Sequence, residues 1–253
     1  MAIAGNKRVL LAGESWIMHT IHQKGFDDFR TTAYGEGHQW LSGALKSGGY
    51  DVEHLPNHLA NEKFPMSVDD LSAYDAVLLS DIGTNTLLLH PDTFIRSISL
   101  PNRLISIRNY VGAGGGLVMI GGYLTFQGID AKGRYAGTAV EEALPITMET
   151  ADDRVETPEG VEPLVVAVNH PIVAGLPKRW PALLGYNRLT AKTEATVVAK
   201  AGSDPLIVAG DYGNGRSVAF ASDCGPHWAP PAFVEWEGYA TMWRQLVGWV
   251  IGD

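Results

Sequence analysis

The chain has 253 residues, of which 45% are hydrophobic and 19% charged, and its formal net charge is -9 at pH 7. This length and composition are those of a globular protein with a sizeable core, and we expect a single domain over residues 1–253. The negative charge repels nucleic acid and anionic membrane surfaces, so neither is an expected partner.

The first half predicts an alternation of buried strands and helices. Fully apolar runs predict strands at 8–13, 76–80 and 117–120, with a further strand at 50–54. Helices are expected at 37–46 and 103–111, because glycines that stop a helix follow each of them. This order is typical of a doubly wound, mostly parallel α/β sheet.

The second half predicts a different arrangement. Residues 195–200, 206–210 and 216–221 indicate strands joined by short turns, and Asn214-Gly215 is a strong hairpin signal. An antiparallel hairpin should therefore join the sheet. Apolar residues at helical spacing predict a last helix over 232–251.

The segment 125–190 is rich in glycine, proline and acidic residues and is expected to be irregular and loop-rich. Such long loops usually carry function or an interface. A second subunit could order it, so we expect a homo-oligomer, with a dimer as the default.

The N-terminus leads directly into a strand-like run, and a signal peptide is not expected there. No apolar run reaches the roughly 20 residues that span a bilayer, and one cysteine cannot form an internal disulfide. A cytoplasmic protein is the expectation.

Ligands of parallel α/β sheets bind beyond the carboxyl ends of the strands. The polar loops at those positions should therefore meet in one cleft that binds a small polar molecule. Their candidate residues are Glu14 after the first strand, Asp81 and Asn85 after the strand at 76–80, Gly121, Gly122 and Tyr123 after the strand at 117–120, and Asp223, Cys224, His227 and Trp228 after the hairpin.

Several motifs resemble the glutamine amidotransferase-like family, and the match covers nearly the whole chain. They are GESW, LSDIGTNTLLL, GGGLVMIGGYLTFQGI, LLGYN and GRSVAFASDCGPHW. That family resembles class I glutamine amidotransferases and the DJ-1/PfpI superfamily, and it is similar to ThuA-like proteins associated with sugar utilisation. The resemblance implies a flavodoxin-like sheet and a nucleophile elbow, the strained turn that carries a catalytic cysteine in active members.

The elbow maps to Gly121-Gly122-Tyr123, which offers no thiol. Glutaminase chemistry through a glutamyl thioester is therefore not available at this turn. Either the glycines only permit a tight turn and a close backbone approach, or their amides hold the carbonyl or hydroxyl of a ligand.

Three residues are candidates for catalysis. Glu14 follows the first strand, as a glutamate does in some DJ-1/PfpI relatives, and could act as an acid or base or simply form a salt bridge or cap. Cys224 and His227 form a C-x-x-H motif in which an imidazolium could activate the thiol. A lone cysteine is most often a buried apolar residue, however. His227, flanked by Asp223 and Trp228, is the stronger candidate.

No metal or cofactor is predicted. His19 with His22, and His54 with His58, have spacings that could serve a metal on a helix, but Pro56 opposes a helix in the second pair. Two functions remain open. One is a repurposed enzyme of hydrolase or amidotransferase descent, in which Glu14 and His227 transfer protons. The other is a non-catalytic ligand-binding or scaffold protein, with carbohydrate as a candidate ligand.

Overall fold

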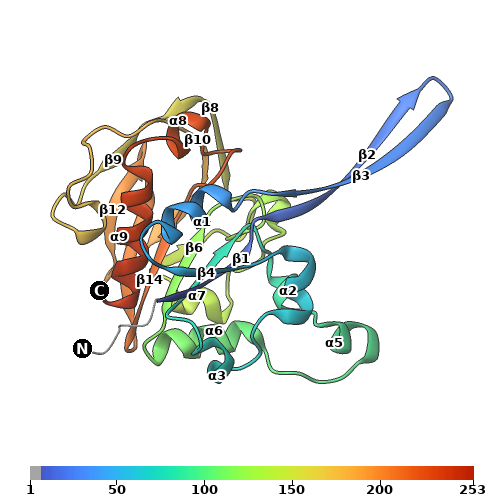
Figure 1. Cartoon of the computed structure of the whole chain (residues 1–253), viewed down its shortest axis with the longest axis horizontal. Coiled ribbons are helices and arrows are strands. Elements are labelled where there is room, and N and C mark those ends of the chain that lie inside the picture. Colours follow the sequence, from blue (N-terminus) through green and yellow to red (C-terminus); the bar gives the residue numbers. More distant parts are fainter. Residues whose placement is uncertain (1–6) are drawn as a thin grey trace.

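A central sheet of eight strands organises the computed structural model, which describes residues 7–253 (Figure 1). The strands from one edge to the other are β4 (Asp51–Leu55), β1 (Arg8–Gly13), β5 (Ala76–Ser80), β6 (Gly116–Ile120), β14 (Gly215–Phe220), β13 (Asp204–Tyr212), β12 (Thr196–Ala201) and β9 (Pro163–Val165). The first five run parallel, and the last three are antiparallel to their neighbours. The mostly parallel sheet with an added antiparallel hairpin is therefore confirmed.

Helices cover the sheet where the sequence predicts them. Helix α1 (Gln39–Lys46) packs against the C-terminal helix α9 (Tyr239–Ile251), which also contacts β5, β6 and β14. Helix α6 (Arg103–Gly112) packs against α7 (Ala139–Ala143) and reaches β14. The shorter helices are α2 (Asn57–Lys63), α3 (Val68–Leu71), α4 (Thr84–Leu88), α5 (Pro91–Arg96) and α8 (Pro231–Val234). No helix within residues 7–253 has both the length and the apolar character to cross a membrane.

The predicted last helix over 232–251 is wrong in one respect, because the chain breaks it into α8 and α9. The break holds the Trp236 ring, which packs against Trp180 with centroids 5.2 Å apart. A Cβ atom at Gly238 would lie 2.3 Å from that ring, so the fold needs glycine at this turn. Helix α9 then ends at Gly252 in the left-handed conformation that commonly stops a helix.

A long hairpin that the sequence analysis missed projects from the body of the protein (Figure 1). We call it the arm. Strands β2 (Ser15–Lys24) and β3 (Asp27–Glu36) pair along their whole length around a turn at Gly25. His19 and His22 therefore lie on a strand, where residues three apart point to opposite faces. His22 stacks on Phe29 and His19 contacts Thr32, so this pair cannot share a metal.

The segment 125–190 has more regular structure than its composition predicts. It contains α7, two short 3-10 turns (Ile129–Ala131 and Pro171–Val173) and the strands β7 (Ile146–Met148), β8 (Arg154–Val161), β9, β10 (Leu183–Asn187) and β11 (Leu189–Ala191). Strand β8 pairs with β10 and β7 with β11. These strands are short and pair with distant partners, so no local periodicity reveals them.

Candidate functional site

Two strained turns lie at the carboxyl ends of neighbouring strands. Glu14 follows β1 with φ 49° and Asp81 follows β5 with φ 47°, both in the left-handed region that favours glycine. Each such residue costs of order 1–3 kcal/mol and persists only where the surrounding structure holds it. The Glu14 amide donates to the Ser80 carbonyl at 3.0 Å. The strain therefore places two carboxyl groups where an α/β sheet binds its ligands.

Glu14, Asp223 and Cys224 form a buried group that we call the acid cluster. One donor or acceptor atom of each lies within 4.8 Å of the others. Glu14 is 3% exposed, Asp223 7% and Cys224 0%. Ser80 donates a hydrogen bond from its hydroxyl to Glu14 and lies 3.8 Å from the Cys224 sulfur. The Glu14 side chain thus lies beneath the surface and is not open to solvent.

Burial and mutual repulsion keep protons on this group near neutral pH. Burial, reinforced by the charge of Asp81, raises the pKa of Glu14 to about 7. Burial also raises the pKa of Asp223 well above its ordinary value, and Glu14 and Asp81 add to the effect. For Asp81, burial raises the pKa while the Leu124 amide opposes the change. Closely spaced carboxyl groups of this kind share protons instead of ionising together.

Cys224 is not placed as a nucleophile. Burial, with the charges of Glu14 and Asp223, raises the pKa of its thiol well above the ordinary value. The predicted activation by His227 does not occur in this geometry, because the Nδ1 atom of His227 instead faces the Asp223 Oδ2 atom at 3.8 Å. The His227 side chain is 62% exposed. The structure fits the interpretation of Cys224 as a buried apolar residue.

Aromatic rings surround the exposed His227. Its ring centroid lies 5.6 Å from that of Trp16 and 6.2 Å from that of Tyr123. The Tyr123 ring lies in turn 5.6 Å from Trp228, which is buried. Glu14, His227 and the glycine turn therefore lie close together, as predicted. Asp223 lies between Glu14 and His227, and Tyr123 of the turn lies next to His227.

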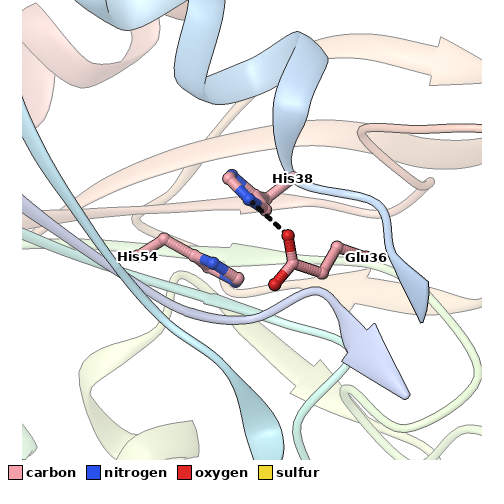
Figure 2. A group of neighbouring side chains, drawn as sticks. All are labelled: Glu36, His38 and His54. Carbon is pink, nitrogen blue, oxygen red and sulfur yellow. Dashed lines mark hydrogen bonds and ion pairs between the residues drawn. The ribbon is translucent and has the colours of Figure 1, made fainter. Parts of the chain in front are cut away.

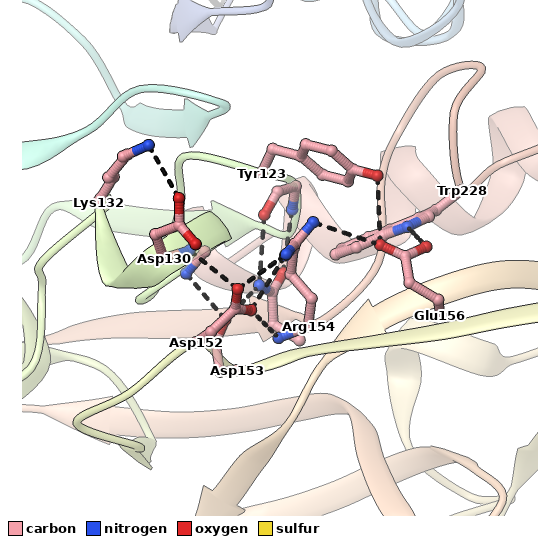
Figure 3. Close-up of polar contacts among 11 residues, drawn as sticks. Tyr123, Asp130, Lys132, Asp152, Asp153, Arg154, Glu156 and Trp228 are labelled. Atoms are coloured by element: carbon pink, nitrogen blue, oxygen red, sulfur yellow. Dashed lines mark hydrogen bonds and ion pairs between the residues drawn. The ribbon is translucent and has the colours of Figure 1, made fainter.

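Strand β8 adds two charged residues that the sequence analysis missed. Glu156 accepts hydrogen bonds from the Tyr123 hydroxyl at 3.2 Å and the Trp228 indole at 3.0 Å, as Figure 3 shows. The Arg154 guanidinium lies over the Tyr123 ring, 4.9 Å from its centroid. Residues two apart on a strand face the same side. The spacing of Arg154 and Glu156 in the sequence could have indicated that they share a face, but only if β8 had first been recognised as a strand.

The amides of Gly121 and Gly122 already have partners within the protein, which decides between the two interpretations of this turn. The Gly121 amide donates to the Phe220 carbonyl at 2.8 Å and the Gly122 amide to Asn187 Oδ1 at 3.0 Å. The Leu124 amide donates to Asp81 Oδ1 at 2.8 Å. A Cβ atom at Gly121 would lie 2.4 Å from the Ala221 oxygen. The tight-turn interpretation of the two glycines is the one that fits.

Asn187 and Asp153 hold this glycine turn in place through hydrogen bonds. Asn187, fully buried, also donates to Asp153 Oδ1 at 2.8 Å. Asp153 accepts from the amides of Gln127 and Gly128 at 3.0 and 2.8 Å. Neither residue was predicted, although Asn187 ends the LLGYN motif.

Asn85 does not join the other predicted residues. It is exposed and faces a separate pocket of about 1010 Å³ between the start of α4 and the loop after β6. Four non-glycine residues of that loop have left-handed backbones: Phe126, Asp130, Ala131 and Arg134. The pocket is lined by Thr84, Asn85, Leu88, Gln127, Asp130, Ala131, Lys132, Arg134, Ala136, Thr138 and Thr150.

A second group of metal-ligating type lies beside the arm: Glu36, His38 and His54 (Figure 2). Burial lowers the pKa of His54, and the Tyr34 hydroxyl lowers the pKa of Glu36. His54 and His58, whose spacing the sequence analysis weighed against Pro56, do not come together on one helix. His58 packs edge-on against Tyr34 instead, at the start of α2 after Pro56.

A family model described as "Putative glutamine amidotransferase" matches residues 8–252. The chain belongs to this glutamine amidotransferase-like family. Two solved structures described as cytoplasmic proteins of Salmonella typhimurium are 45% and 46% identical to it, with TM-scores of 0.93. Both matches cover 96% of this chain, and 98% and 99% of the respective relatives. No curated protein matches the sequence.

A ThuA-like protein from Parabacteroides merdae is similar in fold, with a TM-score of 0.54 and 18% identity over 97% of this chain and 90% of that protein. The fold of this glutamine amidotransferase-like chain is thus shared beyond its close relatives. The turn after β6 carries Gly121 and Gly122 and no thiol.

Proposed function

We propose that this chain binds a small polar metabolite at the carboxyl ends of its parallel strands and does not hydrolyse glutamine through a cysteine thioester. The observation that carries the proposal is the position of Cys224, fully buried beside two carboxyl groups that oppose its ionisation. Thioester chemistry needs a thiolate that the substrate can reach. The elbow offers no alternative thiol, because Gly121 and Gly122 occupy it.

The pocket beside α4 supports the binding part of the proposal. Its volume of about 1010 Å³ suits a small molecule. Asn85, Gln127 and Arg134 line it, and the Arg134 side chain is exposed. A guanidinium with neighbouring amide groups recognises carboxylate or phosphate oxygens. The metabolite class that fits is therefore a small anionic molecule with additional polar groups.

A second candidate function is catalysis by proton transfer, and one observation favours it. Glu14 has a pKa of about 7, close to the value at which a carboxyl group is most effective as a general acid or base near neutral pH. Asp223 connects this buried acid to the exposed His227 ring. In that case His227 would touch the substrate, and Glu14 would exchange protons through Asp223.

The cellular setting is inferred from relatives. The two Salmonella proteins are described as cytoplasmic, and we infer the same compartment and a single working domain for this chain.

A thermal-shift screen of amino acids, sugars and phosphorylated sugars tests the binding proposal. A ligand that binds only the folded state raises the unfolding midpoint. We expect an anionic compound to raise the midpoint of the unmodified chain but not that of Arg134→Ala. Arg30→Ala, on the exposed arm, is the matched control and should keep the shift. The proposal is wrong if no anion stabilises the unmodified chain, or if the same anion stabilises Arg134→Ala equally.

Ammonia release from glutamine tests the chemical part. We expect only background release. Turnover that disappears in Cys224→Ala would make the buried cysteine a nucleophile. For the second candidate, a compound that is converted should bind beside His227, and its conversion should be lost in His227→Ala.

A further inference from the structure

Glu36, His38 and His54 come together from three different elements. Glu36 ends β3, His38 precedes α1 and His54 lies on β4. One ligand-type atom of each lies within 4.8 Å of the others, and His38 Nε2 is 3.2 Å from Glu36 Oε2 (Figure 2). We call this group the His-His-Glu trio.

Each member of the trio makes a hydrogen bond to a partner outside the trio. The His54 Nε2 atom lies 2.8 Å from the Gly13 carbonyl oxygen, which can only accept. Nε2 therefore carries the proton, and the Nδ1 lone pair is free. The His38 Nδ1 atom lies 2.9 Å from the hydroxyl of Ser42, which is buried.

The carboxylate is oriented in the same way. Glu36 Oε1 accepts a hydrogen bond from the Tyr34 hydroxyl at 2.6 Å, while Oε2 faces His38. Metal-ligating histidines almost always donate their other ring N–H to a carbonyl or similar group, and ligating carboxylates are themselves hydrogen-bonded. The surroundings of the trio thus match those of a metal site independently of its residue types.

We propose that the trio binds one divalent transition-metal ion through Glu36 Oε2, His38 Nε2 and His54 Nδ1. Two imidazoles and one carboxylate suit Zn²⁺ and neighbouring first-row ions, and three protein ligands leave a coordination position open. The two rings stack with centroids 3.7 Å apart and 20° between their planes. Lone pairs of near-parallel rings do not meet at one point, so binding turns the His38 ring out of the stack.

The loop that carries the site lies next to Glu14 of the acid cluster. The Gly37 amide, between two ligands, donates to the Glu14 carbonyl at 2.9 Å. A Cβ atom at Gly37 would lie 2.7 Å from Glu14 Oε2, so the carboxyl group is adjacent to the ligand loop. A nearby cation stabilises an ionised carboxylate. Metal binding should therefore lower the pH at which Glu14 loses its proton.

Isothermal titration of the full chain with ZnCl₂ tests the proposal. We expect one Zn²⁺ per chain, with affinity falling at least about 100-fold in His38→Ala and in His54→Ala. His22→Ala is the matched control, since His22 is exposed on the arm and stacks on Phe29, outside the trio, and it should bind as the unmodified chain does. Tyr34→Phe keeps all three ligands and should weaken binding about 10- to 100-fold, as loss of an outer-shell partner does.

Titration with CoCl₂ adds a readout on the unmodified chain that does not depend on a variant folding. Visible absorption of bound Co²⁺ should appear with one equivalent and disappear when Zn²⁺ is added. Absence of stoichiometric binding by the unmodified chain would overturn the proposal. So would binding that persists in folded His38→Ala and His54→Ala, or that is lost equally in His22→Ala.

Discussion

Replacing Glu14 with glutamine should change how the stability of the protein depends on pH. In the folded chain the pKa of Glu14 is about 7, against 4.5 for an ordinary glutamate. The folded state thus holds a proton that the unfolded state has already lost, and the free energy of unfolding falls as pH rises between these two values. At 1.36 kcal/mol per pKa unit, the loss is about 3 kcal/mol.

Below pH 4.5 the carboxyl group is protonated in both states and the full stability is present, whereas above pH 7 folding must bury a charge. Glu14→Gln has nearly the same shape but cannot ionise. Relative to the unmodified chain, it should therefore gain about 3 kcal/mol on going from pH 4.5 to pH 8. The variant also removes a charge that raises the pKa of Asp223, which flattens the profile further.

Urea unfolding followed by tryptophan fluorescence, at constant ionic strength and at several pH values from 4.5 to 8, measures this difference. Glu237→Gln is the matched control, because Glu237 is exposed. It should leave the pH profile unchanged. If the free energy of unfolding of Glu14→Gln changes with pH in parallel with that of the unmodified chain, the buried Glu14 does not hold its proton near neutral pH and the reasoning is wrong.

Three further predictions follow from the fold. Cys224 should resist thiol reagents in the native protein and react only after unfolding, because it is fully buried with a raised pKa. Asn187→Ala should lower stability by about 2–4 kcal/mol in urea unfolding, since it leaves the Gly122 amide and Asp153 without their partner; exposed Asn85→Ala should cost far less. The expected dimer would use the arm, where Ile21 and Phe26 are 57% and 110% exposed and charges of both signs can match a second copy. Light scattering should then show Ile21→Asp to be monomeric, and a monomeric unmodified chain would contradict this.

The sequence predicted the parts of the fold that have a strong local signal. β1 and β5 begin and end at the predicted residues, because their apolar runs are buried on both faces. The hairpin between β13 and β14 was predicted from the Asn-Gly signal, but its two turn residues are Gly213 and Asn214, and the positive φ of 60° lies at Gly213, not at Asn214 or Gly215. The arm was missed because nearly all of its residues are exposed. A strand without a buried face has no alternation to detect, although its aromatic and β-branched residues around Gly25 were a signal of a hairpin.

Most of the candidate residues were expected to lie together and do so, because strand ends converge in any parallel sheet. Their chemical states could not be predicted in this way. Whether Cys224 is a thiolate depends on its burial beside Glu14, a residue 210 positions away in a sequence of 253. The occupied amides likewise depend on distant residues: Asn187, on β10, accepts from the Gly122 amide, and Asp81, after β5, accepts from the Leu124 amide. Such contacts leave no pattern in a single sequence.

The occupied turn limits what a single substitution could do to this chain. A cysteine at position 122 would need a backbone with φ 154°, and its Cβ atom would lie 3.2 Å from the Asp81 carboxylate. A negative charge there opposes the thiolate which glutaminase chemistry needs. A thiol introduced at this turn would therefore also require a change at Asp81.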